Sequence, residues 1–318
     1  LDRRERVMAQ VPGTDADRLE LGSEPGYSLT YWQQVDGSQW RSVHVDPYTG
    51  QVLGFRHSER FDRVGELMPF VYRLHQQLAL GETGHLLLGI VSLLWTIDCF
   101  VGFYLTLPVR GGAPVPSRPR TPWLVRWKPA WLIKTGTLFG QVFTFHRAAG
   151  LWAWPLLFVF AWSSVGFNLG AVYYPAMSPL GLAPDVHEVL PELATPRTDP
   201  RLDWPEALAT ARRLMAVEAS ERGFVVHREG WLGYESDHGI YQYRVHSSAD
   251  VGSRYPGARI WFDSETAHVY GFYAPTGMAA GETISGWLFA LHMGSVGGVP
   301  YRIFVLLRGL AVAALAAT

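Results

Sequence analysis

The sequence is poor in cysteine, in charge and in the short motifs of soluble enzymes. Its single cysteine, Cys99, excludes both an intramolecular disulfide framework and a cysteine-rich metal site. Charged residues make up only 17% of the 318 residues and the formal net charge is −1, so no global basic field indicates nucleic-acid binding. The chain also has no nucleotide-binding glycine motif, Walker A sequence, Ser/His/Asp signature or HExxH pair. These absences disfavour an ATPase, a flavin dehydrogenase or a hydrolase.

Aromatic and apolar residues are abundant instead, and they predict a membrane protein. The 13 Trp, 14 Tyr and 16 Phe residues favour aromatic belts at membrane–water interfaces. The chain has three long apolar runs, and a helix needs ~20 such residues to cross a bilayer. The first run, 86–107, has a single charge, Asp98, and the second, 151–173, has none. The third begins near Trp287 and continues to the end of the chain.

The loop between the first two runs predicts the orientation. Residues 108–145 contain six basic residues and no acidic one. By the positive-inside rule this loop is cytoplasmic, and segments 1–74 and 174–286 then lie in a bacterial periplasm. Since the chain starts at Leu1 on that side and stops within an apolar run, we expect an earlier span before it and a longer third helix after it.

The segment 174–286 has the pattern of a soluble α+β module. Asp203 followed by Pro205 predicts the start of a helix. Strand-like runs then follow as GFVVHRE, GIYQYRVHSS and ARIWFDSETAHVYGFY. Turn residues separate them, which is typical of antiparallel strands.

Two parts of the chain repeat one pattern. VHVDPYTGQVLGF at 43–55 and IWFDSETAHVYGF at 260–272 share Asp, Thr, Val, Gly and Phe at matching positions, and each predicts a β-hairpin with an aspartate-led turn. In both copies a histidine, His75 or His292, follows the turn aspartate by 29 residues and has a glycine six positions later. The chain therefore contains two copies of a hairpin, a connector, a histidine and a span, which indicates common architecture rather than function.

With these motifs the chain resembles the PepSY-associated transmembrane proteins of bacteria. The resemblance rests on VDPYTGQVLGF, RLHQQLALGETG, FHRAAGLWAWPLLF and LHMGSVGGVPYR, and it covers essentially the whole chain. It implies a membrane α-helical bundle in the bacterial inner membrane, with four spans of which three are visible here, and two periplasmic α+β PepSY-like modules. Some members are haem-containing ferric-siderophore reductases linked to iron uptake, and others have no assigned activity.

The predicted organisation alternates modules and helices along the chain. In order, it comprises a periplasmic module (1–74), a transmembrane helix (75–107), a cytoplasmic basic loop (108–145), a transmembrane helix (146–173), a second periplasmic module (174–286) and a third transmembrane helix (287–318).

Three histidines stand at the mouths of the apolar runs and match motifs of the family. Imidazole commonly holds haem iron between apolar helices, although interfacial histidines can also be purely structural. His75 and His292 enter from the periplasmic side and are equivalent in the repeat, so they form a natural pair of axial ligands for one haem b. His146 enters from the cytoplasmic side, and its partner is expected on the missing first helix. The full-length protein would then hold two haems across a ~30 Å core.

Cationic neighbours of these histidines are candidates for contacts with haem propionates. Arg73 lies two residues before His75, and Arg147 directly follows His146, although anchoring in lipid headgroups explains Arg147 at least as well. His85 lies ten residues after His75, which is ~15 Å of helix rise and a different direction around the axis. His85 is therefore expected at headgroup level, with alternative haem ligation or propionate contact left open.

Two charged residues lie inside the apolar runs. A charge within the bilayer is costly, so Asp98 is expected to be protonated or paired inside the bundle, with a proton-linked role as the alternative. Arg308 in the last run is its predicted partner.

Two functions are compatible with these patterns. An integral membrane haem oxidoreductase would take electrons from a cytoplasmic donor and reduce a ferric-siderophore or similar iron complex in the periplasm. A non-enzymatic module would instead bind a peptide, a peptidase or a transporter subunit, and its histidines would be structural. The three histidines at the mouths of the spans favour the first function, because the second leaves them unexplained.

Overall fold

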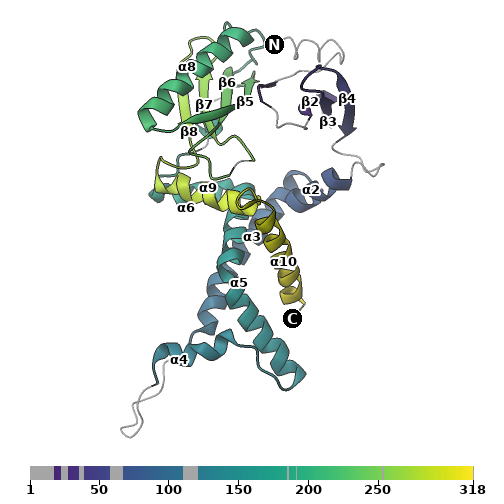
Figure 1. Ribbon diagram of the computed structural model, residues 1–318, viewed down its shortest axis with the longest axis vertical. Coiled ribbons are helices and arrows are strands. Elements are labelled where there is room, and N and C mark those ends of the chain that lie inside the picture. The colour runs from purple at the N-terminus through teal and green to yellow at the C-terminus, as the bar shows by residue number, and fades with distance from the viewer. Residues whose placement is uncertain are drawn as a thin grey trace. The chain divides into compact units, whose positions relative to one another are not determined.

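A computed structural model describes residues 18–22, 28–35, 39–57, 67–109, 121–184, 186–190, 192–252 and 254–317. The chain forms two compact units, each assembled from two stretches of sequence (Figure 1). The first unit comprises Leu1–His85 and Tyr174–Trp287 and carries the two β-sheets. The second comprises Leu86–Tyr173 and Leu288–Thr318 and carries the long apolar helices.

The larger sheet has five antiparallel strands in the order β1-β5-β6-β7-β8. The strands are β1 (Arg18–Glu20), β5 (Val226–Glu235), β6 (Ile240–Ser247), β7 (Ala258–Asp263) and β8 (Val269–Tyr273). Helix α8 (Trp204–Arg222) covers one face of this sheet (Figure 1). The strand regions predicted within 174–286 are therefore confirmed, although β5 begins three residues after the start of the predicted run GFVVHRE and continues six residues beyond its end.

Helix α8 begins and ends at the residues that the sequence predicts. The Asp203 side chain accepts a hydrogen bond from the backbone N–H of Glu206 at 2.9 Å, which satisfies one of the free donors of the first turn. Gly223 ends the helix with a left-handed φ of 71°. Ala207 and Ala211 are fully buried against the sheet, because small side chains let the helix approach closely.

One strand of the larger sheet comes from the N-terminal part of the chain. β1 pairs with β5, and Leu19 lies opposite Leu232 in the register. Both leucines belong to the core beneath α8. The predicted boundaries place residues 1–74 in a module of their own. β1 instead belongs to the sheet formed by the second predicted module, because Leu19 completes the core of that sheet.

The smaller sheet has the order β2-β3-β4. Its strands are β2 (Leu29–Val35), β3 (Gln39–Val45) and β4 (Val52–His57). Leu29, Tyr31, Val43 and Val45 form its own small core.

The two predicted hairpins, β3–β4 and β7–β8, have matching turns. Asp46 Oδ1 accepts hydrogen bonds from the second and third backbone N–H groups after it at 2.7 and 3.1 Å, and Asp263 Oδ1 does the same at 2.9 and 2.7 Å. The residue four positions after each aspartate has a left-handed φ, 73° at Gly50 and 61° at Ala267. Each pair of strands also shifts register at the two residues before its aspartate. These shared details confirm the internal repeat.

The predicted spans 75–107 and 287–318 are each divided into a short helix, a turn and a long helix. α2 (Leu67–Gln77) precedes α3 (Glu82–Thr106), and α9 (Ala280–His292) precedes α10 (Gly298–Ala316). The glycine six positions after each repeat histidine has a left-handed φ, 62° at Gly81 and 60° at Gly298. The histidines therefore lie in the last turn of a separate short helix, and the expectation of one continuous helix at each place is wrong.

Three helices of the described chain are long and apolar enough to cross a membrane: α3, α5 and α10. α5 (Leu138–Asn168) starts eight residues before the predicted boundary at 146, and Thr137 caps it by accepting a hydrogen bond from Gly140 N at 3.3 Å. The break at Leu169 separates α5 from α6 (Gly170–Met177). The predicted basic loop contains α4 (Trp123–Trp127) and the 3-10 helix η2 (Lys128–Trp131).

Candidate functional site

His292 is held against α5 by a hydrogen bond and two aromatic rings. Its Nδ1 lies 2.7 Å from the Oγ of Ser163, a fully buried residue. The rings of Phe160 and Phe167 meet the imidazole edge-on, with centroids 5.0 and 5.2 Å away. Positions 160, 163 and 167 follow the three- and four-residue spacing of one helix face, so a single face of α5 receives the histidine.

A glycine lets the end of α9 approach this face closely. A Cβ added at Gly166 would lie 2.9 Å from the ring of Phe289 and 3.2 Å from the ring of Tyr173. Phe289 lies one helical turn before His292 and packs on Phe167 with ring centroids 4.7 Å apart. The missing side chain at position 166 therefore determines where Phe289, and with it His292, lies.

The second unit also contains an open cavity of about 710 Å³ between faces of α3, α5 and the end of α10. His146 on α5 and Asp98 on α3 are among the residues that line it. Most of the other wall is apolar and includes Trp95, Phe103, Phe139, Phe143, Trp154 and Leu157. Because the α5 residues of the wall repeat at three- and four-residue intervals, the cavity follows one side of that helix.

Arg147, beside His146, is bonded within the protein and also borders this cavity. Its Nη2 donates to the Pro129 carbonyl at 2.8 Å, and its guanidinium lies 5.6 Å from the Phe143 ring centroid. Its Nε is buried and, within the part of the chain that the structure describes, has no hydrogen-bond partner. Arg147 therefore brings an unsatisfied buried donor to the cavity wall.

Comparison with protein-family models matches residues 2–318 to the PepSY-associated TM region. The chain belongs to the PepSY-associated transmembrane family. The resemblance seen in the sequence is thereby confirmed, and the three long apolar helices agree with a membrane family. A search of curated proteins found no match.

The predicted pairing of Asp98 with Arg308 in this PepSY-associated protein is not formed. Among the ion pairs of the described residues, none joins the two side chains. Arg308 instead donates from Nη1 to the Trp152 carbonyl at 3.3 Å and lies 4.9 Å from the Phe304 ring centroid. Asp98 lies on the cavity wall. The prediction was wrong because sequence position alone places both residues inside the membrane but does not say which helix faces each one.

His75, Arg73 and His85 lie in the first unit. His75 is on the last turn of α2 and is exposed, whereas His85 is half-buried in the first turn of α3. Arg73 has a buried Nε–H that, over the described ranges, donates to no hydrogen-bond partner. Since His292 belongs to the second unit, the pairing of His75 with His292 stays a prediction.

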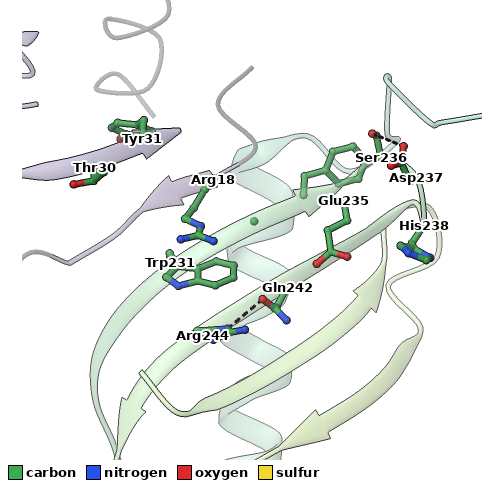
Figure 2. A pocket seen from close by; sticks show the side chains of 12 residues that line it. Arg18, Thr30, Tyr31, Trp231, Glu235, Ser236, Asp237, His238, Gln242 and Arg244 are labelled. Atoms are coloured by element: carbon green, nitrogen blue, oxygen red, sulfur yellow. Dashed lines mark hydrogen bonds between the residues drawn. The ribbon is translucent and has the colours of Figure 1, made fainter. Parts of the chain in front are cut away.

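The sheet face opposite α8 carries a second, polar cavity of about 500 Å³ (Figure 2). Arg18 and Arg244 lie beside the ring of Trp231, at 3.9 and 4.8 Å from its centroid. Glu235 and His238 line the same cavity, and Figure 2 shows them away from the two arginines. The face therefore combines a cationic aromatic cluster with an acidic region.

Two residues of these sites, Ser163 and Trp231, are not predicted from the sequence. Ser163 is one, and its signal is a pair of serines within the uncharged run FVFAWSSVGF. Trp231 is the other, and it has no sequence signal, because the predicted strand GFVVHRE ends at Glu229. Over the described ranges, no group of three or more His, Cys, Asp and Glu side chains is arranged to hold a metal ion directly.

Proposed function

We propose that this protein is a haem-binding oxidoreductase of the bacterial inner membrane, which passes electrons from a cytoplasmic donor to a ferric-siderophore or similar iron complex in the periplasm. The observation that carries the proposal is the spacing of two candidate ligands along α5, of which one lies on this helix and the other is hydrogen-bonded to it. His146 of α5 lines the cavity, and Ser163, seventeen residues further along α5, holds His292. That separation is about 25 Å of helix rise, close to the ~30 Å hydrocarbon core of a bilayer.

The residues around His146 fit a haem. The cavity of about 710 Å³ lies within the usual range of cofactor sites, and its wall is mostly apolar and aromatic. An imidazole is the commonest protein ligand of haem iron in helical bundles, and His146 supplies one. The buried Nε of Arg147 needs an acceptor, which a haem propionate would provide.

The protein itself would supply ligation, orientation and a dry environment. His146 and His292 would each hold iron through a ring nitrogen, with His75 as the proposed second ligand beside His292. Phe160 and Phe167 would pack around a haem beside the His292 ring, and the aromatic wall of the cavity would do the same beside His146. A bound haem supplies reversible one-electron chemistry.

The basic loop supports the direction of transfer. Arg126, Lys128 and Lys134 lie in its described part, and such loops face the cytoplasm by the positive-inside rule. The two sheets would then face the periplasm, where the iron complex arrives. Reduction favours release of iron because hard oxygen donors hold Fe(II) more weakly than Fe(III).

A second function is favoured by the polar cavity of the larger sheet. A non-enzymatic module would bind a peptide, a peptidase or a transporter subunit there. Arg18 and Arg244 can bind a carboxylate while Trp231 packs against an apolar group, and Glu235 can bind a cation (Figure 2). This function requires no haem.

The visible absorption spectrum of the protein, purified in detergent from haem-replete cells, separates the two functions. We expect a b-type haem spectrum in the wild-type protein. His146→Ala and His292→Ala should each lose about half of the absorbance, because each removes a ligand from a different haem. A colourless wild-type protein would overturn the proposal in favour of the partner-binding module.

A matched histidine variant controls for general damage. His227 is an exposed residue of β5 in the first unit and is not a candidate ligand, so His227→Ala should keep the full spectrum. Full haem absorbance in both His146→Ala and His292→Ala would show that neither histidine is a haem ligand.

A further inference from the structure

We propose that Ser163 is a positioning residue for His292: it holds the imidazole as the Nδ1–H tautomer, so that Nε2 is the nitrogen that binds haem iron. This inference rests on the proposed function, and it adds a residue that acts through the ligand. Ser163 lies on α5, whereas His292 is the last residue of α9, so the two elements fix the ring jointly.

The argument begins with the single proton of the serine hydroxyl. Ser163 Oγ lies 2.6 Å from the Val159 carbonyl oxygen and 3.2 Å from the Phe160 carbonyl oxygen. Two oxygens approach to 2.6 Å only when a proton lies between them. The hydroxyl therefore donates to Val159, as buried serines in helices often do to the carbonyl four residues earlier.

The proton in the hydrogen bond between Ser163 and His292 must therefore come from the imidazole. Ser163 Oγ and His292 Nδ1 are 2.7 Å apart, which is a short hydrogen bond. Because the serine proton is directed at Val159, the serine lone pair accepts from Nδ1–H. In a neutral imidazole only one nitrogen carries a proton, so the lone pair for a metal is on Nε2.

The surroundings hold this arrangement in place. Ser163 is fully buried, and Phe160 and Phe167 pack edge-on against the imidazole. Rotation of the ring would have to displace one of these groups. A histidine ligand that donates its second N–H in this way is oriented and made more basic, and loss of the acceptor typically costs ~10–100-fold in metal affinity or activity.

The chain offers a matched control in the next residue. Ser164 is also a serine of α5 but is only half-buried. We compare Ser163→Ala, Ser163→Thr and Ser164→Ala in the purified full-length protein. The readouts are haem affinity, the reduction potential of each haem, and the electron paramagnetic resonance spectrum of the oxidised protein.

Ser163→Ala should lower the affinity for one haem ~10–100-fold and raise the reduction potential of that haem, because a less basic imidazole stabilises Fe(III) less. Ser163→Thr keeps a hydroxyl and should restore both quantities, and Ser164→Ala should match the wild type. If Ser163→Ala matches Ser164→Ala in affinity, potential and resonance spectrum, the positioning role is overturned.

A readout that needs no haem separates failure of this inference from failure of the proposed function. Nitrogen-15 magnetic resonance of histidine-labelled protein, assigned by the signal lost in His292→Ala, reports which ring nitrogen is protonated. If the wild-type protein holds no haem, the proposed function fails, while an Nδ1–H signal that is lost in Ser163→Ala still supports the positioning. An Nε2–H signal in the haem-free wild type overturns the positioning.

Discussion

Gly166 of α5 lies so close to the end of α9 that a methyl group at this position would collide with it. Gly166→Ala would place a Cβ 2.9 Å from the Phe289 ring, so that ring, and His292 one turn later, must move. We expect a loss of about 1–3 kcal/mol in the free energy of unfolding, typical of an overpacked contact. Thermal unfolding of the protein in detergent measures the change.

Gly309→Ala is the control for this substitution, because it also lies in a long apolar helix, α10, and a Cβ there meets nothing within 4 Å. Alanine is the better helix former, so this variant should be unchanged or more stable by about 0.5–1 kcal/mol. Equal unfolding temperatures for the two alanine variants would contradict the argument from close packing.

The candidate site was predictable residue by residue only in part. His146 and His292 are identifiable because a titratable side chain at the edge of an apolar run stands out in a sequence. Ser163 does not stand out, since serine is common in membrane helices and its role depends on which helix lies opposite. The same reason explains the wrong partner for Arg308, whose hydrogen bond goes to the backbone of Trp152.

At the scale of elements, sequence patterns predicted the turns and helix ends that are determined by interactions between residues close in the chain. The hairpins at Asp46 and Asp263 and the start of α8 at Asp203 follow from side chains that bond to the backbone two or three residues away. The break between α2 and α3 was missed because Leu78 and Ala79 adopt left-handed φ values of 52° and 55°, which no sequence rule anticipates for these residues. β1 was missed because its three residues pair with a strand about two hundred residues later.

Glu20 of β1 predicts that the stability of the first unit depends on pH. Burial raises the pKa of Glu20 from 4.5 to about 7, and nearby Arg18 opposes the shift only in part. In the unfolded chain the carboxyl ionises near 4.5, whereas in the fold it holds its proton up to about 7. The contribution of Glu20 to stability is therefore full below pH 4.5 and is lost as the pH rises through 7, by an amount on the order of 3 kcal/mol.

Glu20→Gln removes the titrating group and keeps its shape. Wild-type unfolding temperatures, measured at intervals from pH 4.5 to 8, should fall relative to those of Glu20→Gln as the pH rises. Parallel curves for the two proteins would show that Glu20 ionises normally in the fold.

On the scale of the whole molecule, the two units divide the work that the proposed function requires. The first unit carries both sheets and the polar cavity, and the second carries the apolar helices with His146 and His292. Each unit is assembled from two separate stretches of the chain, and the repeat contributes to this, because each copy supplies one hairpin to the first unit and one long helix to the second.

The proposed electron path along α5 needs both His146 and His292, and this predicts how electron transfer across a membrane responds to the loss of either residue. About 25 Å separates the two sites along the helix, which is too far for efficient transfer in one step if either haem is absent. In the assay, a reductant is sealed inside proteoliposomes and a ferric complex is added outside. We expect His146→Ala and His292→Ala each to reduce the complex at least tenfold more slowly than the wild-type protein, although each variant keeps about half of its haem. The rate is followed by trapping Fe(II) with an impermeant chromophore, and His227→Ala is the control. A wild-type rate in either ligand variant would contradict a path through both sites, since one haem and a direct donor would then be sufficient.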